Sequence, residues 1–143
     1  DIAANLNVEK PSGESGIPSA QAQKVWLFPY KYERTNNEVS RLWNLFNKEL
    51  KDQITDQDFE AALQIRSTGK TKLTEALFYV NPEKYLPING PTKPYIKEEL
   101  GIDTKFNSYN EYIEILSQIK EKIETMGKHN CFWKLKLESI FKN

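Results

Sequence analysis

Apolar residues recur at three- and four-residue spacing through most of the sequence after residue 36, and this period is typical of helices that bury one face. The first run extends to about residue 51. It places five apolar residues on one helical face: Val39, Leu42, Trp43, Phe46 and Leu50. We therefore expect a buried face here, with Trp43 and Phe46 in the core rather than on the surface.

Two further helices carry start signals. Thr55 precedes a run to about residue 66, with Asp58 at the third helical position, which is the spacing of a capping box. Ser108 and Glu111 repeat that spacing before the longest helix, which we expect to end near residue 126 with Gly127 as its cap. The inward stripe predicted for this helix is Tyr112, Leu116, Ile119, Ile123 and Met126.

Prolines divide the middle of the chain. A helix is predicted over about residues 71–80 and ends at Asn81, because Pro82 disfavours helical geometry in the residue before it. The side chains expected to face inward from it are Leu73, Ala76, Leu77 and Val80. Further prolines then divide residues 82–100 into a turn, an extended piece and a short helix that Gly101 ends.

Composition separates an N-terminal arm from the helical part. Residues 1–23 are polar and rich in Gly, Ser and Pro, so they cannot bury enough surface to offset the entropy of ordering. Residues 24–30, KVWLFPY, resemble an edge strand or extended segment, since Pro29 argues against a central strand. The sequence thus predicts a flexible linker or arm over 1–23 and one mainly α domain over 24–143. That domain is expected to be a compact bundle of about five or six helices with one or two short extended segments.

Composition also excludes several kinds of function. With one cysteine and one histidine in 143 residues, the chain cannot form an internal disulfide, and Cys131 with His129 supplies at most two of the four ligands of a structural zinc. No apolar run approaches the roughly 20 residues that cross a bilayer. The reduced thiol expected of a lone cysteine fits a cytoplasmic protein. We find no catalytic constellation, and we expect no metal, no cofactor and no enzymatic activity in this domain.

The stretch STGKTKLTEAL, residues 67–77, contains the Gly-Lys-Thr that ends a nucleotide-binding phosphate loop. Such a loop also needs a glycine five residues before that glycine and a buried strand leading into it. Position 64 is Gln64, and the residues before it have a helical pattern. We therefore reject nucleotide binding and interpret the stretch as a glycine turn between two helices.

This turn is the candidate site for a contact to DNA. Backbone amides at a helix start, together with lysine, can bind a phosphate. The candidate DNA-binding residues are Thr68, Gly69, Lys70, Lys72 and Lys93. The alternative is that Ser67 or Thr71 caps a helix and the lysines only keep the loop solvated, since caps are far commoner than phosphate sites. Tyr85 and Tyr95 are the aromatic residues expected at the surface, where they could stack on bases.

Residues 68–96, TGKTKLTEALFYVNPEKYLPINGPTKPYI, resemble a segment of McrB-like restriction proteins. There a glycine turn leads into Leu-Thr-x-x-Leu-Phe, then a Pro-x-Lys-Phe/Tyr-x-Pro-hydrophobic element and a Tyr-hydrophobic helix start. The matching residues are Gly69, Leu73, Thr74, Leu77, Phe78, Pro82, Lys84, Tyr85, Pro87, Ile88, Tyr95 and Ile96. Residues 106–123 also resemble the helix that follows in such proteins. Asn89 departs from the pattern, because relatives commonly carry Asp there.

The resemblance implies a prokaryotic defence protein. In that family the segment precedes an AAA+ motor domain that hydrolyses GTP and works with an McrC-like nuclease on DNA. The motor's motifs are absent from these residues, and Asp1 in place of Met suggests a piece of a longer chain. We therefore expect a non-catalytic helical module of a McrB-like DNA restriction subunit that contacts DNA phosphates or positions a DNA-specificity domain. The alternative is a protein-interaction or spacer domain that docks on the motor domain or a partner subunit. A small enzyme with a DNA-glycosylase-like hairpin would need a buried carboxylate beside Gly69, and the sequence singles out none.

Overall fold

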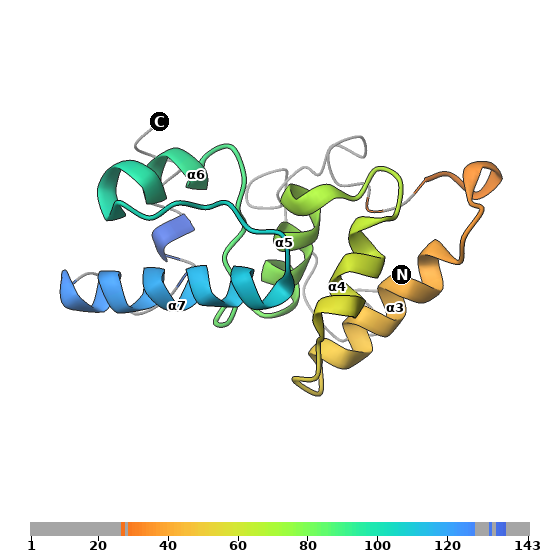
Figure 1. Ribbon diagram of the computed structural model, residues 1–143, viewed down its shortest axis with the longest axis horizontal. Coiled ribbons are helices and arrows are strands. Elements are labelled where there is room, and N and C mark those ends of the chain that lie inside the picture. Colours follow the sequence, from red (N-terminus) through yellow and green to blue (C-terminus); the bar gives the residue numbers. More distant parts are fainter. Residues whose placement is uncertain (1–26, 28, 128–131, 133, 137–143) are drawn as a thin grey trace, which may run out of the picture.

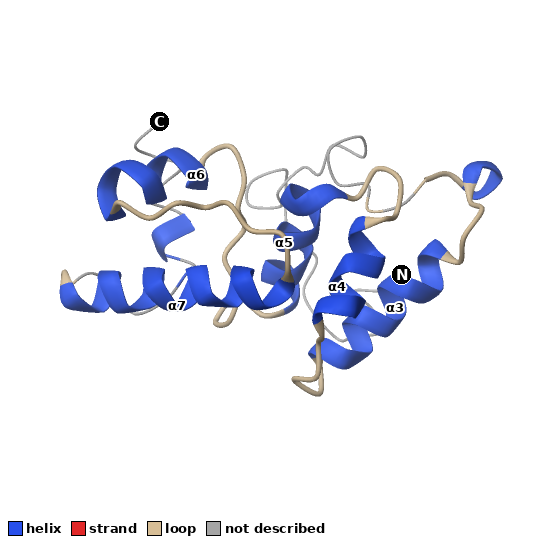
Figure 2. Ribbon diagram, in the orientation of Figure 1, coloured by secondary structure: helices blue, strands red, loops and turns tan. Residues whose placement is uncertain are grey.

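The computed structural model describes residues 27, 29–127, 132 and 134–136, and these form a mainly helical, compact bundle (Figure 1). This confirms the predicted fold class. Within the described residues there is no strand, so Leu27 and Pro29 lie in irregular backbone rather than in an edge strand (Figure 2). The predicted arm over 1–23 lies outside the described residues.

The helices follow one another through short connections. In chain order they are η1 (Lys31–Glu33), α3 (Glu38–Glu49), α4 (Asp56–Leu63), α5 (Gly69–Val80), α6 (Thr92–Tyr95), the π-helical η2 (Ile96–Leu100) and α7 (Tyr109–Thr125). Residues 132 and 134–136 are also helical. Helix α4 packs on α3, α5 and α7, and α7 also packs on η2. Figure 1 shows α5 between the α3–α4 pair and the half that holds α6 and α7.

An aromatic cluster forms the centre of the core. Phe59 of α4 is fully buried, and its ring lies 5.7 Å from that of Tyr109 and 6.1 Å from that of Tyr112, measured between ring centroids. The Tyr112 hydroxyl donates a hydrogen bond of 2.7 Å to the carbonyl of Leu86. Burial raises the pKa of Tyr112, so this hydroxyl stays a neutral donor. The cluster therefore joins α4, α7 and the proline-rich segment in one core.

The predicted helix starts agree with the structure. Thr55 and Asp58 form a complete capping box at the start of α4. Partial burial opposes ionisation of Asp58, but hydrogen bonds from Lys48 and Thr55 outweigh it and lower the pKa of this carboxyl to about 2. At α7 only half of the box forms: the Ser108 hydroxyl accepts from the Glu111 amide. Helices α4 and α7 therefore begin where a polar side chain accepts a hydrogen bond from a free backbone amide.

The prediction that Trp43 and Leu50 face the core is wrong. Trp43 is 59% exposed and Leu50 is 63% exposed, whereas Leu45 is buried. The reason is that α3 packs closely on α4 but not on α5, so part of its apolar face borders an open space between α3 and α5. Val80 of α5 and Met126 after α7 are also exposed where the sequence predicted burial.

Tyr85 and Tyr95 are buried, which corrects the prediction that they lie at the surface. The segment that carries them folds inward around a turn between Asn89 and Thr92. The Asn89 side-chain oxygen accepts a 3.3 Å hydrogen bond from the amide of Thr92, whose hydroxyl donates to the carbonyl of Pro87. This turn places both tyrosines in the core, where they cannot stack on bases.

Candidate functional site

The turn before α5 is held by contacts within the chain. Ser67 and Gly69 adopt positive φ angles of 78° and 66°. Thr68 is the N-cap of α5, but its side chain caps no helix amide: the buried hydroxyl donates to the carbonyl of Leu27. Because the N-cap is Thr68, the alternative prediction that Ser67 or Thr71 caps this helix is wrong. Thr68 acts as a tie between α5 and the segment at Leu27.

The lysines of this turn also contact their own chain. The Lys70 amino group donates to the carbonyl of Phe106 and, over 3.2 Å, to the side-chain oxygen of Asn107. The Lys72 amino group donates to the carbonyl of Ser67 over 2.9 Å. Both lysines therefore help to hold the turn before α5 in place.

Lys70 also lines a basic cleft of about 470 Å³, together with Lys93 and Lys105. Its lining residues are Lys70, Ile88, Lys93, Asp103, Thr104, Lys105, Phe106 and Asn107. The structure thus brings together Lys70 and Lys93 of the predicted site and adds Lys105. The other three predicted residues, Thr68, Gly69 and Lys72, lie outside the lining. One carboxylate, Asp103, lies among these three lysines. The cleft carries a local excess of positive charge that the net charge of the chain does not reveal.

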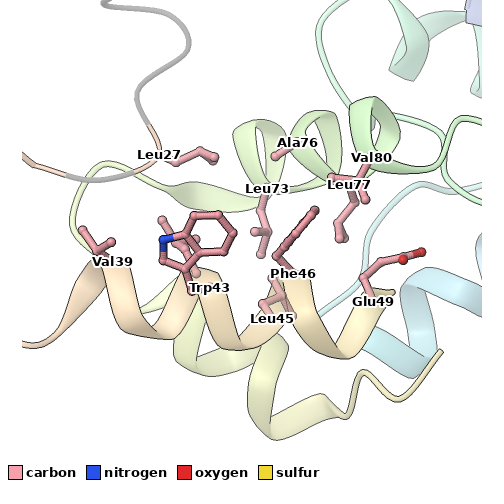
Figure 3. A pocket seen from close by; sticks show the side chains of 11 residues that line it. Leu27, Val39, Trp43, Leu45, Phe46, Glu49, Leu73, Ala76, Leu77 and Val80 are labelled. Atoms are coloured by element: carbon pink, nitrogen blue, oxygen red, sulfur yellow. The ribbon is translucent and has the colours of Figure 1, made fainter. Parts of the chain in front are cut away.

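An apolar groove of about 390 Å³ lies between α3 and α5. Its lining residues are Leu27, Val39, Leu42, Trp43, Leu45, Phe46, Glu49, Leu73, Ala76, Leu77 and Val80. Figure 3 shows Trp43 and Phe46 pointing from α3 toward Leu73 and Leu77 of α5 across this space. The Trp43 and Phe46 rings meet edge to face, with centroids 5.5 Å apart. We call this feature the apolar groove.

Glu49 is the one charged side chain among the eleven that line the apolar groove. It is only 5% exposed, and its Oε1 accepts a 3.2 Å hydrogen bond from the side-chain amide of Asn81. Glu49 stands near Val80 and Leu77, at the opposite end from Val39 (Figure 3). Sequence periodicity predicts an apolar face on α3, but it gives no sign that a buried acid closes the space beside it.

Metal chemistry finds no support in the part of the chain that the structure describes. No group of three or more His, Cys, Asp or Glu side chains there could hold a metal ion. His129 and Cys131 lie outside the described residues. None of the described helices is long and apolar enough to cross a membrane.

The chain matches a known protein family. A family described as "Domain of unknown function (DUF8425)" matches residues 2–140. No curated protein and no solved structure matches the chain.

Proposed function

The chain belongs to the DUF8425 family, and we propose that it is a non-catalytic protein-interaction domain that receives a helical segment of a partner protein. The observation that carries the proposal is the apolar groove. All but one of its lining side chains are apolar, and Trp43 beside it is 59% exposed. Following the resemblance to McrB-like proteins, the partner segment belongs to a motor domain or to another subunit.

Leaving such a surface in water has a physical cost. Contiguous exposed apolar patches are uncommon on monomeric proteins and often mark interaction sites. Tryptophan is also enriched among the residues that contribute most to binding at protein interfaces. Trp43 and Phe46 together present an aromatic surface that a partner can cover. Covering it removes apolar area from water, which is the main driving force of association.

A helix is the occupant that fits the walls of the apolar groove. α3 and α5 are both 12 residues long, and they face each other across it. Two helices that leave an apolar groove between them accept a third whose side chains interdigitate with theirs, at an axis separation of about 8–10 Å. Amphipathic helices bind such grooves through apolar residues at positions i, i+3, i+4 and i+7.

The test begins with a displayed library of helical peptides that vary at the apolar and terminal positions, selected on the wild-type domain. We expect selected peptides to bind in calorimetric titrations and to lose affinity roughly tenfold or more against Ala76→Glu, because each 1.4 kcal/mol changes affinity tenfold. Ala76 lines the apolar groove, and glutamate is a good helix former that places a charge there.

The matched control is Asn47→Glu, which adds the same charge on α3 at an exposed position outside the groove lining. It should leave peptide affinity unchanged. A library that yields no binder, or binders that tolerate Ala76→Glu, would refute the proposed function.

A contact to DNA phosphates is the second candidate, and the basic cleft favours it. Lys70, Lys93 and Lys105 come from three separate segments and line one cleft. Among the described residues none of the three forms an ion pair with a carboxylate. In this case the domain is the DNA-contacting module of a McrB-like restriction subunit, which acts with an AAA+ motor domain and an McrC-like nuclease.

Lys93→Glu combined with Lys105→Glu tests this candidate. Both side chains are exposed, whereas the amino groups of Lys70 and Lys72 are engaged with the chain itself. If the cleft binds DNA, the fluorescence anisotropy of a labelled duplex should report affinity lowered roughly tenfold and a salt slope flatter by about two. Lys120→Glu with Lys122→Glu on α7 makes the same charge change away from the cleft. Equal effects of the two double variants would exclude a specific role for the cleft.

A further inference from the structure

Glu49 is a buried carboxylate that has no cationic partner in the part of the chain that the structure describes. It is 5% exposed, and among the described residues the side-chain amide of Asn81 is the one hydrogen-bond donor to its carboxylate. Within the described part of the chain, no lysine or arginine lies within ion-pair distance of it. By comparison Glu38, the other buried acid of α3, accepts hydrogen bonds from the backbone amides of Thr35 and Asn36 at 3.0 and 3.2 Å. Asp58 of α4 is paired with Lys48 at 2.7 Å. Among the described residues, Glu49 is therefore the buried acid of α3 that has neither a cation nor a backbone amide to stabilise its charge.

A purely apolar occupant of the groove would bury the Glu49 carboxylate further without pairing its charge. Glu49 lines the apolar groove beside Val80, so a helix seated there covers the remaining access of water to the carboxylate. An ionised carboxylate removed from water without a cation is strongly unfavourable. A lysine or arginine on the occupant would instead form a charge-assisted hydrogen bond in a water-poor site, where such bonds are stronger.

From this geometry we infer that the partner helix carries a lysine or arginine at the end that lies beside Val80, and that Glu49 selects for it. This inference rests on the proposed function of the apolar groove. Leu73, Leu77 and Phe46 supply affinity without discriminating among apolar partners. Glu49 adds specificity, because partners with a neutral or acidic residue at that position leave the carboxylate unpaired or repelled.

The experiment uses the full chain and peptides selected from the helical library. We expect the terminal position of selected peptides to be enriched in lysine or arginine. A double-mutant cycle then combines Glu49→Gln in the domain with replacement of that peptide lysine by norleucine, which keeps the aliphatic stem and removes the charge. We expect the wild-type domain to bind the lysine peptide roughly tenfold more tightly than the norleucine peptide. We expect Glu49→Gln to bind the two peptides with equal affinity, so that this lysine advantage disappears.

Glutamine preserves the shape of the side chain and an oxygen that can accept from Asn81, so the variant should fold; its thermal melting curve checks this. Glu60→Gln, which removes one negative charge from an exposed position on α4, should leave the lysine advantage intact. If peptides bind in the groove with equal affinity whether they carry lysine or norleucine, the inference about Glu49 is wrong and the proposed function stands. If no peptide binds the groove, both are wrong.

Discussion

Replacing Phe59 with alanine is expected to lower the free energy of unfolding by about 3–5 kcal/mol. Phe59 is fully buried on α4, and its ring contacts the rings of Tyr109, Tyr112 and Phe106. Truncation leaves a cavity among three rings that belong to α7 and the loop before it, and these cannot all move to fill it. Urea denaturation followed by circular dichroism measures the change. If Phe59→Ala does not fold, Phe59→Leu is expected to fold with a smaller loss.

Trp43→Ala is the informative comparison, because the sequence predicts the same burial for Trp43 as for a core aromatic. The structure places Trp43 59% exposed beside the apolar groove, so we expect its removal to change the free energy of unfolding by less than about 1 kcal/mol. A loss as large as that of Phe59→Ala would contradict this placement and would return Trp43 to the core.

The helix starts could be predicted from the sequence because they depend on a few neighbouring residues. Thr55 and Asp58 lie three positions apart, and their hydrogen bonds involve only their own side chains and amides. The end of α5 at Asn81 is likewise dictated by Pro82. Such local rules account for the predicted fold class and for most element boundaries.

Burial could not be predicted as well, because periodicity shows that a helix face is apolar but does not show what covers it. Trp43 and Leu50 fit the same helical stripe as their neighbours, yet they are exposed. For Tyr85 and Tyr95 the error is the opposite one, because they were predicted to be exposed and are buried. Their proline-rich segment looks like a surface loop, but the turn between Asn89 and Thr92 folds it into the core.

The candidate site was predictable only in part. Lys70 and Lys93 do line one cleft, but Thr68 is buried, and Lys72 is bound to the carbonyl of Ser67. Lys105 was missed, because it joins the others through contacts between segments far apart in the sequence. The apolar groove was missed for the same reason. The resemblance to McrB-like restriction proteins and the contact to DNA stay predictions.

Thr74→Val is expected to lower the free energy of unfolding by about 2 kcal/mol, although it replaces one side chain by another of nearly the same shape. Thr74 lies in the middle of α5 and is fully buried. Its hydroxyl accepts a 3.0 Å hydrogen bond from the amide of Ile88, which is also buried. Valine leaves that amide without an acceptor in a site closed to water, and an unpaired buried donor is costly.

This hydrogen bond links α5 to the proline-rich segment, so its loss should also be visible locally. Hydrogen exchange of the Ile88 amide is expected to become faster in Thr74→Val relative to amides elsewhere in the core. Thr74→Ser keeps the acceptor and should retain slow exchange at Ile88 while losing the stability of one methyl group, about 1 kcal/mol. Thr71→Val makes the same chemical change at an exposed position of α5 and should alter neither quantity. If Thr74→Val and Thr74→Ser protect the Ile88 amide equally, the hydroxyl does not hold the segment, and the inward fold of residues 82–95 must depend on the turn between Asn89 and Thr92 alone.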